Sequence, residues 1–356
     1  MNKALRRGYA AAAALALALP ALAACAGGSQ PAQDGDLPSV TFITMTDTVP
    51  YFISMRDAAK EEAEKLGLPI SFEAGKFDGD EQGQITAVEN AITRGDDAIV
   101  ITPSGPGVSQ AIAKAKDAGL LVIQLENSLP PEEFDLTVAT NNLPAGVAIG
   151  EYAKGKLKGK DLKIAMLGFF TDKVVKFDID RYQGFLEGLG IDVGDPAVKG
   201  DEATSGTYDG GNYQIVCNEQ TNGAEDLGRT AMENCLSRNP DINLVFTGSE
   251  PIAAGAANAL EAAGLSDQAM IVSVDGGCTG VQAIEAGQLA ATAQQYPAKM
   301  AEIAMDAVLE YSKSGTLPAV TEGDDYVDTG TALVTNTPLD GLTSIDTAAA
   351  SKICWG

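Results

Sequence analysis

Polar and aromatic side chains gather directly after the apolar runs of this 356-residue sequence. Most are carboxylates and amides, and two are aromatic rings. Carboxylates accept charge-assisted hydrogen bonds from hydroxyl groups, amides both donate and accept, and a ring covers the apolar face of a carbohydrate. This combination suits a neutral polyhydroxylated small molecule. The residues concerned are Asp47, Tyr51, Phe52, Glu126, Asn127, Asn141, Asn142, Ser249, Glu250, Asp275, Gln294 and Gln295.

Each of these positions also has an ordinary structural interpretation. Residues 51–52 are equally suited to filling core space, and Asp275 before two glycines suits the start of a turn. The pairs 126–127, 141–142 and 294–295 are compatible with a solvated loop, a linker with left-handed backbone and a crossover strand, respectively. Recurrence at equivalent places in two similar halves of the chain favours the functional interpretation.

The first aromatic pair is predicted to lie at the start of a helix. The apolar run Val40–Met45 predicts a buried strand, and Pro50 suits the first turn of the helix that follows, where an N–H has no partner within the helix. Thr48 is expected to cap this helix through its side-chain oxygen. The rings of residues 51–52 then lie at the carboxyl end of a strand, where open α/β sheets bind ligands.

The residue types exclude several chemistries. The sequence has no histidine, so it has neither a histidine-dependent nucleophile nor a histidine metal site. Four cysteines follow Cys25 without a C-x-x-C pair, so disulfides are expected in preference to zinc or redox chemistry. Of the possible pairings, a bond between Cys217 and Cys235 is favoured, because a strand and the helix that packs on it bring the two together. We expect no cofactor, no metal and no catalytic residue.

The first residues of the sequence have the features of an export signal. Basic residues precede the apolar run 10–21, which is too short to span a bilayer, and the following "LAAC" resembles the lipobox of bacterial lipoproteins. Residues 1–24 are therefore predicted to form a signal peptide, Cys25 to carry a lipid, and residues 25–37 to form a flexible tether. The protein is expected to be exported and anchored to the cell membrane, facing the periplasm or the extracellular side.

The charge of the sequence also limits the ligand. The net charge is −25, and it becomes −28 when residues 1–24 and their three cations are removed. Such a surface repels nucleic acid and anionic lipid, and it disfavours an anionic ligand. Lysine and arginine are scattered, without a block that resembles a phosphate cradle. We therefore expect a neutral ligand and no nucleic acid.

Apolar strands alternate with amphipathic helices through the rest of the chain, as in βαβ units of a parallel sheet that is covered on both faces. The pattern then restarts, because "DAIVITPSGPGVSQAI" and "NLVFTGSEPIAAGAA" both comprise a strand, a turn with Ser and Pro, and a small-residue helix. The sequence therefore predicts two similar α/β domains, each with a doubly wound parallel sheet. The carboxyl ends of the two sets of strands are expected to meet at a cleft between the domains.

The boundaries of the two lobes follow from the same pattern. The N-terminal lobe is predicted to comprise residues 38–140 and 296–327, and the C-terminal lobe residues 141–295 and 328–356, with a hinge between them. Residues 194–212 are rich in Gly, Asp and Thr and are predicted to form a surface loop.

Several motifs occur in order along residues 38–335: "VPYFISMRDAAKEEAEKLGL", "DAIVITPS", "VIQLEN", "RYQGFLEGL", "AMENCLSRNPDINLVFTGSEPIAAGA", "IVSVDGG" and "GQLAATAQQYP". In these motifs the sequence resembles the type I periplasmic sugar-binding proteins of the ribose-binding-like group. Within that group, "TAMENCLSRNPDIN" followed by "VSVDGGC" is most similar to the fructose-type substrate-binding proteins of ATP-binding-cassette importers.

The resemblance implies which residues contact a sugar. Aromatic contacts are implied for Tyr51 and Phe52. Polar contacts are implied for Glu126, Asn127, Ser249, Asp275 and Gln295. Two positions depart from the group, because Ile179 replaces a common arginine and Val49 replaces an asparagine that precedes the proline and the aromatic pair. Asp178, Asp180 and Arg181 are the candidates to compensate for these losses.

The resemblance also implies a function. The expected protein is a monomeric lipoprotein that binds a fructose-like hexose, a pentose or a polyol and delivers it to the permease subunits of an ATP-binding-cassette importer. Alternatives on the same fold are a nucleoside or autoinducer receptor and a sensory subunit that signals to a membrane kinase. A secreted glycosidase with paired carboxylates is a further alternative. A transcriptional repressor is disfavoured by the export signal and by the lack of a basic helix-turn-helix.

Overall fold

The computed structural model describes residues 37–77, 79–126, 128–171 and 175–356. All of these belong to one unit, Gly35–Gly356. The predicted signal peptide, Cys25 and all of the predicted tether except Leu37 lie outside the described residues. Among the helices that the structure describes, none combines the length and the apolar character that a membrane crossing requires.

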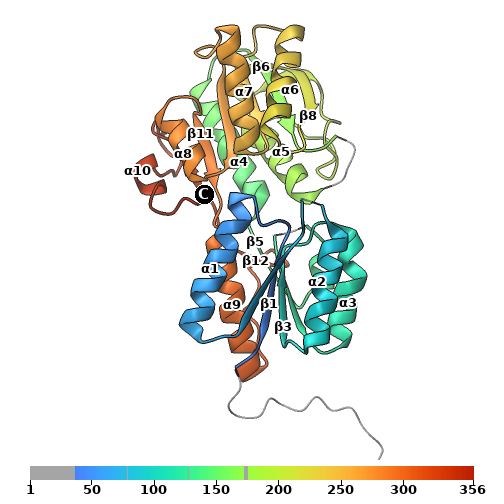
Figure 1. Ribbon diagram of the computed structural model, residues 1–356. Coiled ribbons are helices and arrows are strands. Elements are labelled where there is room, and N and C mark those ends of the chain that lie inside the picture. The colour runs from blue at the N-terminus through green and yellow to red at the C-terminus, as the bar shows by residue number, and fades with distance from the viewer. Residues whose placement is uncertain (1–36, 78, 127, 172–174) are drawn as a thin grey trace, which may run out of the picture. The chain divides into compact units, whose positions relative to one another are not determined.

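The first sheet has the strand order β12-β5-β4-β3-β1-β2, and all neighbouring strands are parallel. Its strands are β1 (Val40–Thr44), β2 (Ile70–Ala74), β3 (Ala98–Ile101), β4 (Leu121–Leu125), β5 (Leu136–Ala139) and β12 (Val327–Asp328). Its helices are α1 (Pro50–Leu66), α2 (Glu81–Arg94), α3 (Ser109–Asp117) and α9 (Pro297–Ser314), with 3-10 turns η1 (Pro106–Val108) and η2 (Pro131–Glu133). In this N-terminal lobe, α1 and α9 cover one face of the sheet, and α2 and α3 cover the other (Figure 1).

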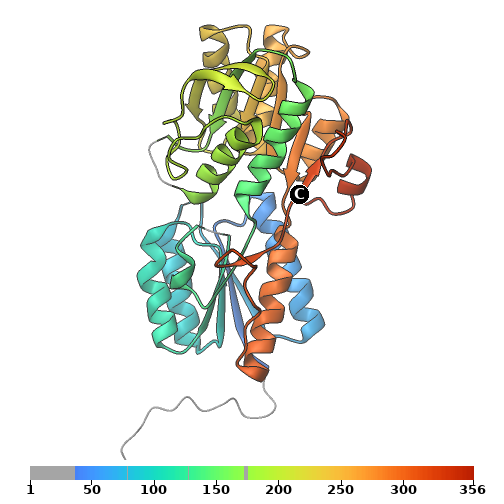
Figure 2. The ribbon, with the colours of Figure 1, turned by 180° about the vertical axis from the view of Figure 1, so that it is seen from behind.

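The second sheet has the order β13-β11-β10-β9-β6-β8-β7, and its strands at both edges pair antiparallel. Its strands are β6 (Leu162–Gly168), β7 (Ser205–Tyr208), β8 (Gly211–Gln220), β9 (Leu244–Thr247), β10 (Met270–Asp275), β11 (Ala291–Gln294) and β13 (Ala332–Val334). Its helices are α4 (Asn142–Lys156), α5 (Lys176–Leu189), α6 (Glu225–Arg238), α7 (Glu250–Ala263), α8 (Cys278–Glu285) and α10 (Thr347–Ala350). In this C-terminal lobe, α4 and α5 cover one face, and α6 to α8 cover the other (Figure 2).

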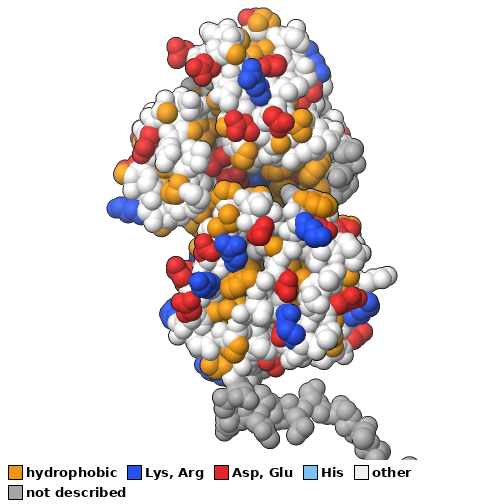
Figure 3. Space-filling model, in the orientation of Figure 1, with side chains coloured by type: hydrophobic (Ala, Val, Ile, Leu, Met, Phe, Trp, Pro, Cys, Tyr) orange, Lys and Arg blue, Asp and Glu red, His pale blue; other side chains and the backbone are white. Residues whose placement is uncertain are grey.

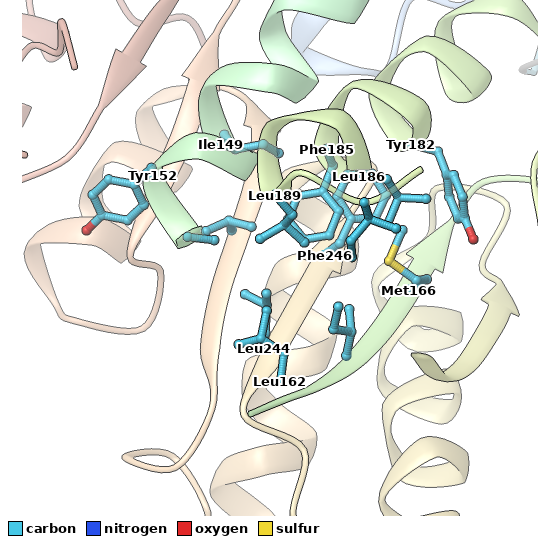
Figure 4. Packing of buried hydrophobic residues seen from close by; sticks show 14 of the residues in the cluster. Ile149, Tyr152, Leu162, Met166, Tyr182, Phe185, Leu186, Leu189, Leu244 and Phe246 are labelled. Carbon is cyan, nitrogen blue, oxygen red and sulfur yellow. The ribbon is translucent and has the colours of Figure 1, made fainter. Parts of the chain in front are cut away.

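The central strands of both sheets, such as β1, β3, β4 and β9, are buried on both faces, which explains why they are mainly apolar. In β1, for example, Phe42 packs towards α1 and α9, whereas its neighbour Ile43 packs towards α2 and α3. In the C-terminal lobe, Phe185 and Leu189 of α5 pack with Phe246 of the sheet, as Figure 4 shows. The structure thus has the two α/β lobes with parallel-sheet cores that the sequence predicts.

Three local details differ from the expectations or refine them. Residues 205–208 form the edge strand β7, and residues 211–212 begin β8, which pairs with β7 in an antiparallel hairpin. Residues 194–212 are therefore only in part a loop. Asp328 pairs with Ala139 in the first sheet, so β12 extends across the expected lobe boundary between residues 327 and 328.

The start of α1 also differs in its cap. The helix begins at Pro50 as predicted, but Val49 occupies the N-cap position and no side chain caps the helix. The hydroxyl of Thr48 lies 2.9 Å from the hydroxyl of Thr46, because the loop turns before the helix begins. The predicted cap from Thr48 is therefore wrong, and proline alone marks the first turn.

Candidate functional site

Tyr51 and Glu126 come together at the carboxyl ends of β1 and β4. Tyr51 follows Pro50 in the first turn of α1, and its hydroxyl donates a hydrogen bond to Oε1 of Glu126. Glu126 follows β4 directly and has a φ of 66°. A glutamate gains nothing from left-handed backbone, so the conformation is held by its surroundings and marks a candidate site.

The pKa shifts of Tyr51 and Glu126 show which of the two donates the hydrogen bond. Burial is the main cause that raises the pKa of Glu126, whereas the Tyr51 hydroxyl and the charge of Arg181 lower it. Burial, followed by the Glu126 charge, raises the pKa of Tyr51 well above its ordinary value. Arg181 and Asp275 also shift the pKa of Tyr51, so side chains from the two lobes act on each other electrostatically. Tyr51 is therefore a hydrogen-bond donor at any physiological pH.

Arg181 of α5 links several elements of the C-terminal lobe. Its Nε donates to Oδ1 of Asn142 at 2.8 Å, and its Nη1 donates to the carbonyl oxygen of Gly248 at 2.8 Å. The same Nη1 lies 3.6 Å from Oδ1 of Asp275, and the Arg181 side chain is only 5% exposed. Its Nη2 makes no hydrogen bond to a described residue. This nitrogen is the part of the guanidinium that remains for a ligand.

Aromatic rings surround the same guanidinium. Its Cζ lies 5.1 Å from the ring centre of Phe177 and 6.0 Å from that of Phe169, within the range of cation–π contacts. Phe169 in turn fits closely against Gly223 and Gly248, where a Cβ would lie within 3 Å of its ring. The rings therefore have a fixed place beside Arg181. The sequence arguments missed both, although Phe169 directly follows the apolar run of β6, whereas Phe177 lies in the first turn of α5.

Close packing of two helices brings Arg181 to Asn142. Four glycines form the contact between α4 and α5: Gly146, Gly150, Gly184 and Gly188. A Cβ on Gly184 would lie 2.3 Å from the carbonyl oxygen of Leu143, and one on Gly146 would lie 2.5 Å from that of Arg181. Because the backbones of α4 and α5 are in direct contact, the side chain of Asn142 at the start of α4 reaches Arg181 in the second turn of α5. The position of Arg181 thus depends on small residues a turn or more away.

Asp275 ends β10 with a φ of 145° and is buried. Its Oδ2 accepts from the backbone N–H of Glu250 at 3.1 Å, and its Oδ1 accepts from Nε2 of Gln295 at 3.0 Å. With Arg181 also close, three groups hold this carboxylate in place. Asp275, Gln295 and Arg181, which the sequence singles out separately, are neighbours in the structure.

Glu250 has a different environment. Its carboxylate accepts from the N–H groups of Gly276 (2.9 Å) and Gly277 (3.0 Å) and from the hydroxyl of Thr292 (2.9 Å). A Cβ on Gly280 would lie 1.9 Å from its Cδ, so α8 begins directly against it. Glu250 therefore fixes the turn between β10 and α8, and its oxygens are already engaged within the lobe.

The pair of Asp275 and Glu250 makes stability depend on pH. Burial raises the pKa of both, and the charge of Asp275 raises that of Glu250 further. A raised carboxyl pKa means that the folded protein binds more protons than the unfolded chain above about pH 4, so stability falls as the pH rises. We expect the difference in free energy of unfolding between the Asp275→Asn variant and the wild type to change in favour of the variant as the pH rises from about 4 to about 7. The change is at most about 1.4 kcal/mol per pH unit.

Urea unfolding of the two proteins across this range measures that difference. The relevant quantity is the slope of this free-energy difference against pH. A difference that is the same at every pH reflects only the lost contact with Arg181. Glu261→Gln at an exposed position of α7 is the matched control and should give no slope. A difference between Asp275→Asn and wild type that is constant or falls with pH would contradict the expectation.

Two buried polar atoms next to this cluster have no hydrogen-bond partner among the described residues: Oγ of Ser249 and Oε1 of Gln295. Ser249 directly follows Gly248, whose carbonyl accepts from Arg181. Buried polar atoms are rarely left unpaired, since each costs about 1–3 kcal/mol. A ligand with hydroxyl groups would supply the missing partners.

The remaining predicted residues lie apart from this cluster or outside the described part. Asp178 is 1% exposed and accepts from the backbone N–H groups of Phe169 and Phe170, both at 3.1 Å, and pairs with Lys199. It is engaged within the C-terminal lobe. Asp47 is exposed, and Asn127 lies outside the described residues. Phe52 is buried in the core with α9, so of the two rings Tyr51 is the one beside Glu126.

Asn141 lies at a different place. Its side chain donates to Oδ1 of Asp324 at 3.3 Å, and its N–H donates to Oδ1 of Asp328 at 2.9 Å. It lines a separate cavity of about 510 Å³. The cavity lining consists of Asn141, Leu143, Lys176, Asp180, Gly323, Asp324, Asp325 and Tyr326. Of the residues predicted to bind the ligand, only Asn141 and Asp180 are in this lining, and Asp180 is one of the candidates to compensate for Ile179.

The cysteines form two disulfides. Cys217 of β8 is bonded to Cys235 of α6, the pairing favoured from the sequence, and Cys278 is bonded to Cys354. Among the described residues, no group of three or more His, Cys, Asp and Glu side chains is arranged to hold a metal ion. On the face drawn in Figure 3, acidic side chains are spread over both lobes among isolated lysines and arginines.

The chain matches known proteins along most of its length. A family model described as a periplasmic binding protein domain matches residues 40–316. The ribose import binding protein RbsB of Escherichia coli (strain K12) is 27% identical over 261 residues, which cover 73% of this chain and 79% of that protein. The D-ribose/D-allose-binding protein of Pseudomonas aeruginosa is 26% identical over 319 residues, which cover 85% and 91%.

A solved structure supports the fold. A periplasmic solute-binding protein of an ABC transporter from Actinobacillus succinogenes 130z, with bound D-allose, superposes with a TM-score of 0.71. It is 24% identical in sequence, and the match covers 88% of this chain and 99% of that one.

Proposed function

Because the chain belongs to the periplasmic binding protein family, we propose that it binds a neutral monosaccharide or polyol at the cluster of Tyr51, Glu126, Arg181, Asp275 and Gln295. The protein then delivers the bound sugar to an ATP-binding-cassette importer. In support, RbsB is named an import binding protein, and the solved Actinobacillus succinogenes structure is of an ABC transporter solute-binding protein. The activity is binding without bond cleavage. One observation carries the proposal. The protein holds the charged side chains of Arg181 and Asp275 in place, and the buried Oγ of Ser249 and Oε1 of Gln295 beside them have no hydrogen-bond partner among the described residues.

The chemistry of the cluster favours a neutral ligand. Two carboxylates, Glu126 and Asp275, accept hydrogen bonds from hydroxyls, and Nη2 of Arg181 donates to a hydroxyl or a ring oxygen. The guanidinium charge is already close to Asp275, at 3.6 Å. An anionic ligand would therefore meet more negative than positive charge. The rings of Tyr51 and Phe169 are available to cover an apolar sugar face.

The sugar is captured because residues of both lobes contact it. Tyr51 and Glu126 belong to the N-terminal lobe, whereas Arg181, Asp275 and Gln295 belong to the C-terminal lobe. A sugar that contacts both sets binds the closed arrangement more tightly than an open one, so it shifts the population towards closure. The permease then recognises the closed form. Micromolar affinity needs about −8 kcal/mol, which several charge-assisted hydrogen bonds and one ring contact supply after ordering costs.

The finer parts of the proposal concern the sugar and the anchor. Ribose, allose and a fructose-like ketohexose are the first candidates, the last from the motif "TAMENCLSRNPDIN". Cys25 is proposed to carry the lipid that holds the protein at the membrane, with the protein acting as a monomer. Replacement of Cys25 by serine should release the protein from the membrane fraction, which immunoblotting of fractionated cells detects.

A thermal-shift screen tests the proposed function. The panel contains neutral pentoses, hexoses and polyols, together with nucleosides and sugar acids. We expect at least one neutral sugar or polyol to raise the melting temperature, because a ligand that binds only the folded protein stabilises it. A response to nucleosides or sugar acids alone, or no response to any neutral sugar, would contradict the proposal.

Removal of one negative charge gives a more specific prediction. Glu126→Gln should weaken binding of the sugar about tenfold, because a neutral amide oxygen accepts more weakly than a carboxylate, by about 1.4 kcal/mol. The melting temperature without sugar should change little, since the amide still accepts from Tyr51. Calorimetric titration measures the affinity. Glu133→Gln, in a turn of the same lobe, is the control, and equal affinities of all three proteins would refute the role of Glu126.

A further inference from the structure

The only tryptophan of the sequence, Trp355, is attached to the C-terminal lobe next to the candidate site. The disulfide between Cys278 and Cys354 joins the segment that follows α10 to the first residue of α8. The N–H of Cys278 also donates to the carbonyl oxygen of Trp355 at 2.9 Å. Since Asp275 lies three residues before Cys278, this attachment places the indole beside the end of β10.

The indole also reaches the N-terminal lobe. Its ring centre lies 5.0 Å from that of Tyr51, with the planes at 80°, which is an edge-to-face arrangement. On the other side, a Cβ on Gly277 would lie 3.4 Å from the indole. A Cβ on Gly356 would lie 3.1 Å from Cβ of Pro50. Trp355 thus lies between the turn after β10 and the first turn of α1.

One polar atom of this side chain is unpaired. The Nε1–H of Trp355 is buried and has no hydrogen-bond partner among the described residues. A tryptophan that only fills core space finds a partner for this donor or leaves it in water. Here the donor is on the ring that contacts Tyr51, whose hydroxyl is bonded to Glu126.

We propose that Trp355 is a ligand-contacting residue that the Cys278–Cys354 disulfide holds in the site. Its Nε1–H donates to a sugar oxygen, while the edge-to-face contact with Tyr51 keeps the indole beside the bound sugar. This inference rests on the proposed sugar-binding function and adds a determinant of specificity to it. Loss of the disulfide leaves Trp355 in the chain but removes its fixed position.

Tryptophan fluorescence tests the proposal directly, because Trp355 is the only source of that signal. The wild-type protein is titrated with the neutral sugar that gives the largest thermal shift, in parallel by fluorescence and by calorimetry. We expect the emission to change with the same midpoint as the heat. A calorimetric signal without any change in emission would overturn the proposal but leave the proposed function intact, whereas no binding of any neutral sugar would overturn both.

Variants separate contact from stability. Trp355→Phe keeps an aromatic ring and the disulfide but removes the N–H, and it should weaken binding about tenfold with an unchanged melting temperature. The double variant Cys278→Ser/Cys354→Ser should also weaken binding while it retains the tryptophan. Tyr311→Phe, at an exposed position of α9, is the matched control and should bind as the wild type. Unchanged affinity of Trp355→Phe would overturn the proposal.

Discussion

Replacement of Arg181 by lysine should weaken sugar binding about 100-fold, equivalent to about 2.7 kcal/mol. Lysine keeps the charge but has one compact ammonium group, so it cannot at once bond Asn142 and the Gly248 carbonyl, approach Asp275 and still donate to a ligand. Calorimetric titration gives the affinity, and thermal unfolding in the absence of sugar shows how much stability is lost.

The control for this prediction is Arg229→Lys. Arg229 lies on α6, is 54% exposed and pairs with Glu233 at 2.9 Å. An exposed ion pair contributes little, so both affinity and stability should stay at the wild-type level. If Arg181→Lys binds the sugar as tightly as Arg229→Lys, the guanidinium is only a structural link within the C-terminal lobe.

Replacement of Gly184 by alanine should lower the free energy of unfolding by about 3 kcal/mol. A methyl group there would lie 2.3 Å from the carbonyl oxygen of Leu143, so α4 and α5 must move apart. This separation also moves Arg181 away from Asn142, so the sugar affinity should fall as well. Urea unfolding and calorimetry measure the two effects.

Glu187→Ala is the matched control, since Glu187 is exposed on the same helix. Its effect on stability should stay within about 0.5 kcal/mol. An alanine at Gly184 that is tolerated as well as an alanine at Glu187 would show that the two helices do not need their close contact.

The sequence predicts the fold well, because its strongest signals come from periodicity and repetition. Apolar runs such as those of β1 and β3, separated by amphipathic helices, leave few alternatives to parallel sheets covered on both faces. Ligands of open α/β sheets bind at the carboxyl ends of the strands. Because strand ends can be located from the sequence, this rule also predicts Glu126, Asp275 and Gln295 as site residues.

Details of side-chain partners are less predictable. The sequence singles out Glu250 because it follows a strand, and Asp178 because it lies next to Ile179. Glu250 bonds the turn before α8, whereas Asp178 bonds backbone groups after β6 and pairs with Lys199, so both are engaged within the C-terminal lobe. Position in the sequence alone does not show whether such a carboxylate bonds a ligand or the protein itself. Trp355 has no local sequence signal, because the disulfide of its neighbour Cys354 and a backbone hydrogen bond to Cys278 place it next to Tyr51.

The structure of the protein with the neutral sugar selected by the screen tests the central claim most directly. We predict the sugar within hydrogen-bond distance of Nη2 of Arg181 and of the carboxylates of Glu126 and Asp275. Oγ of Ser249 and Oε1 of Gln295 should then be paired with sugar hydroxyls. A sugar in the cavity lined by Asn141 and Asp180, without contact to Arg181, would contradict the account.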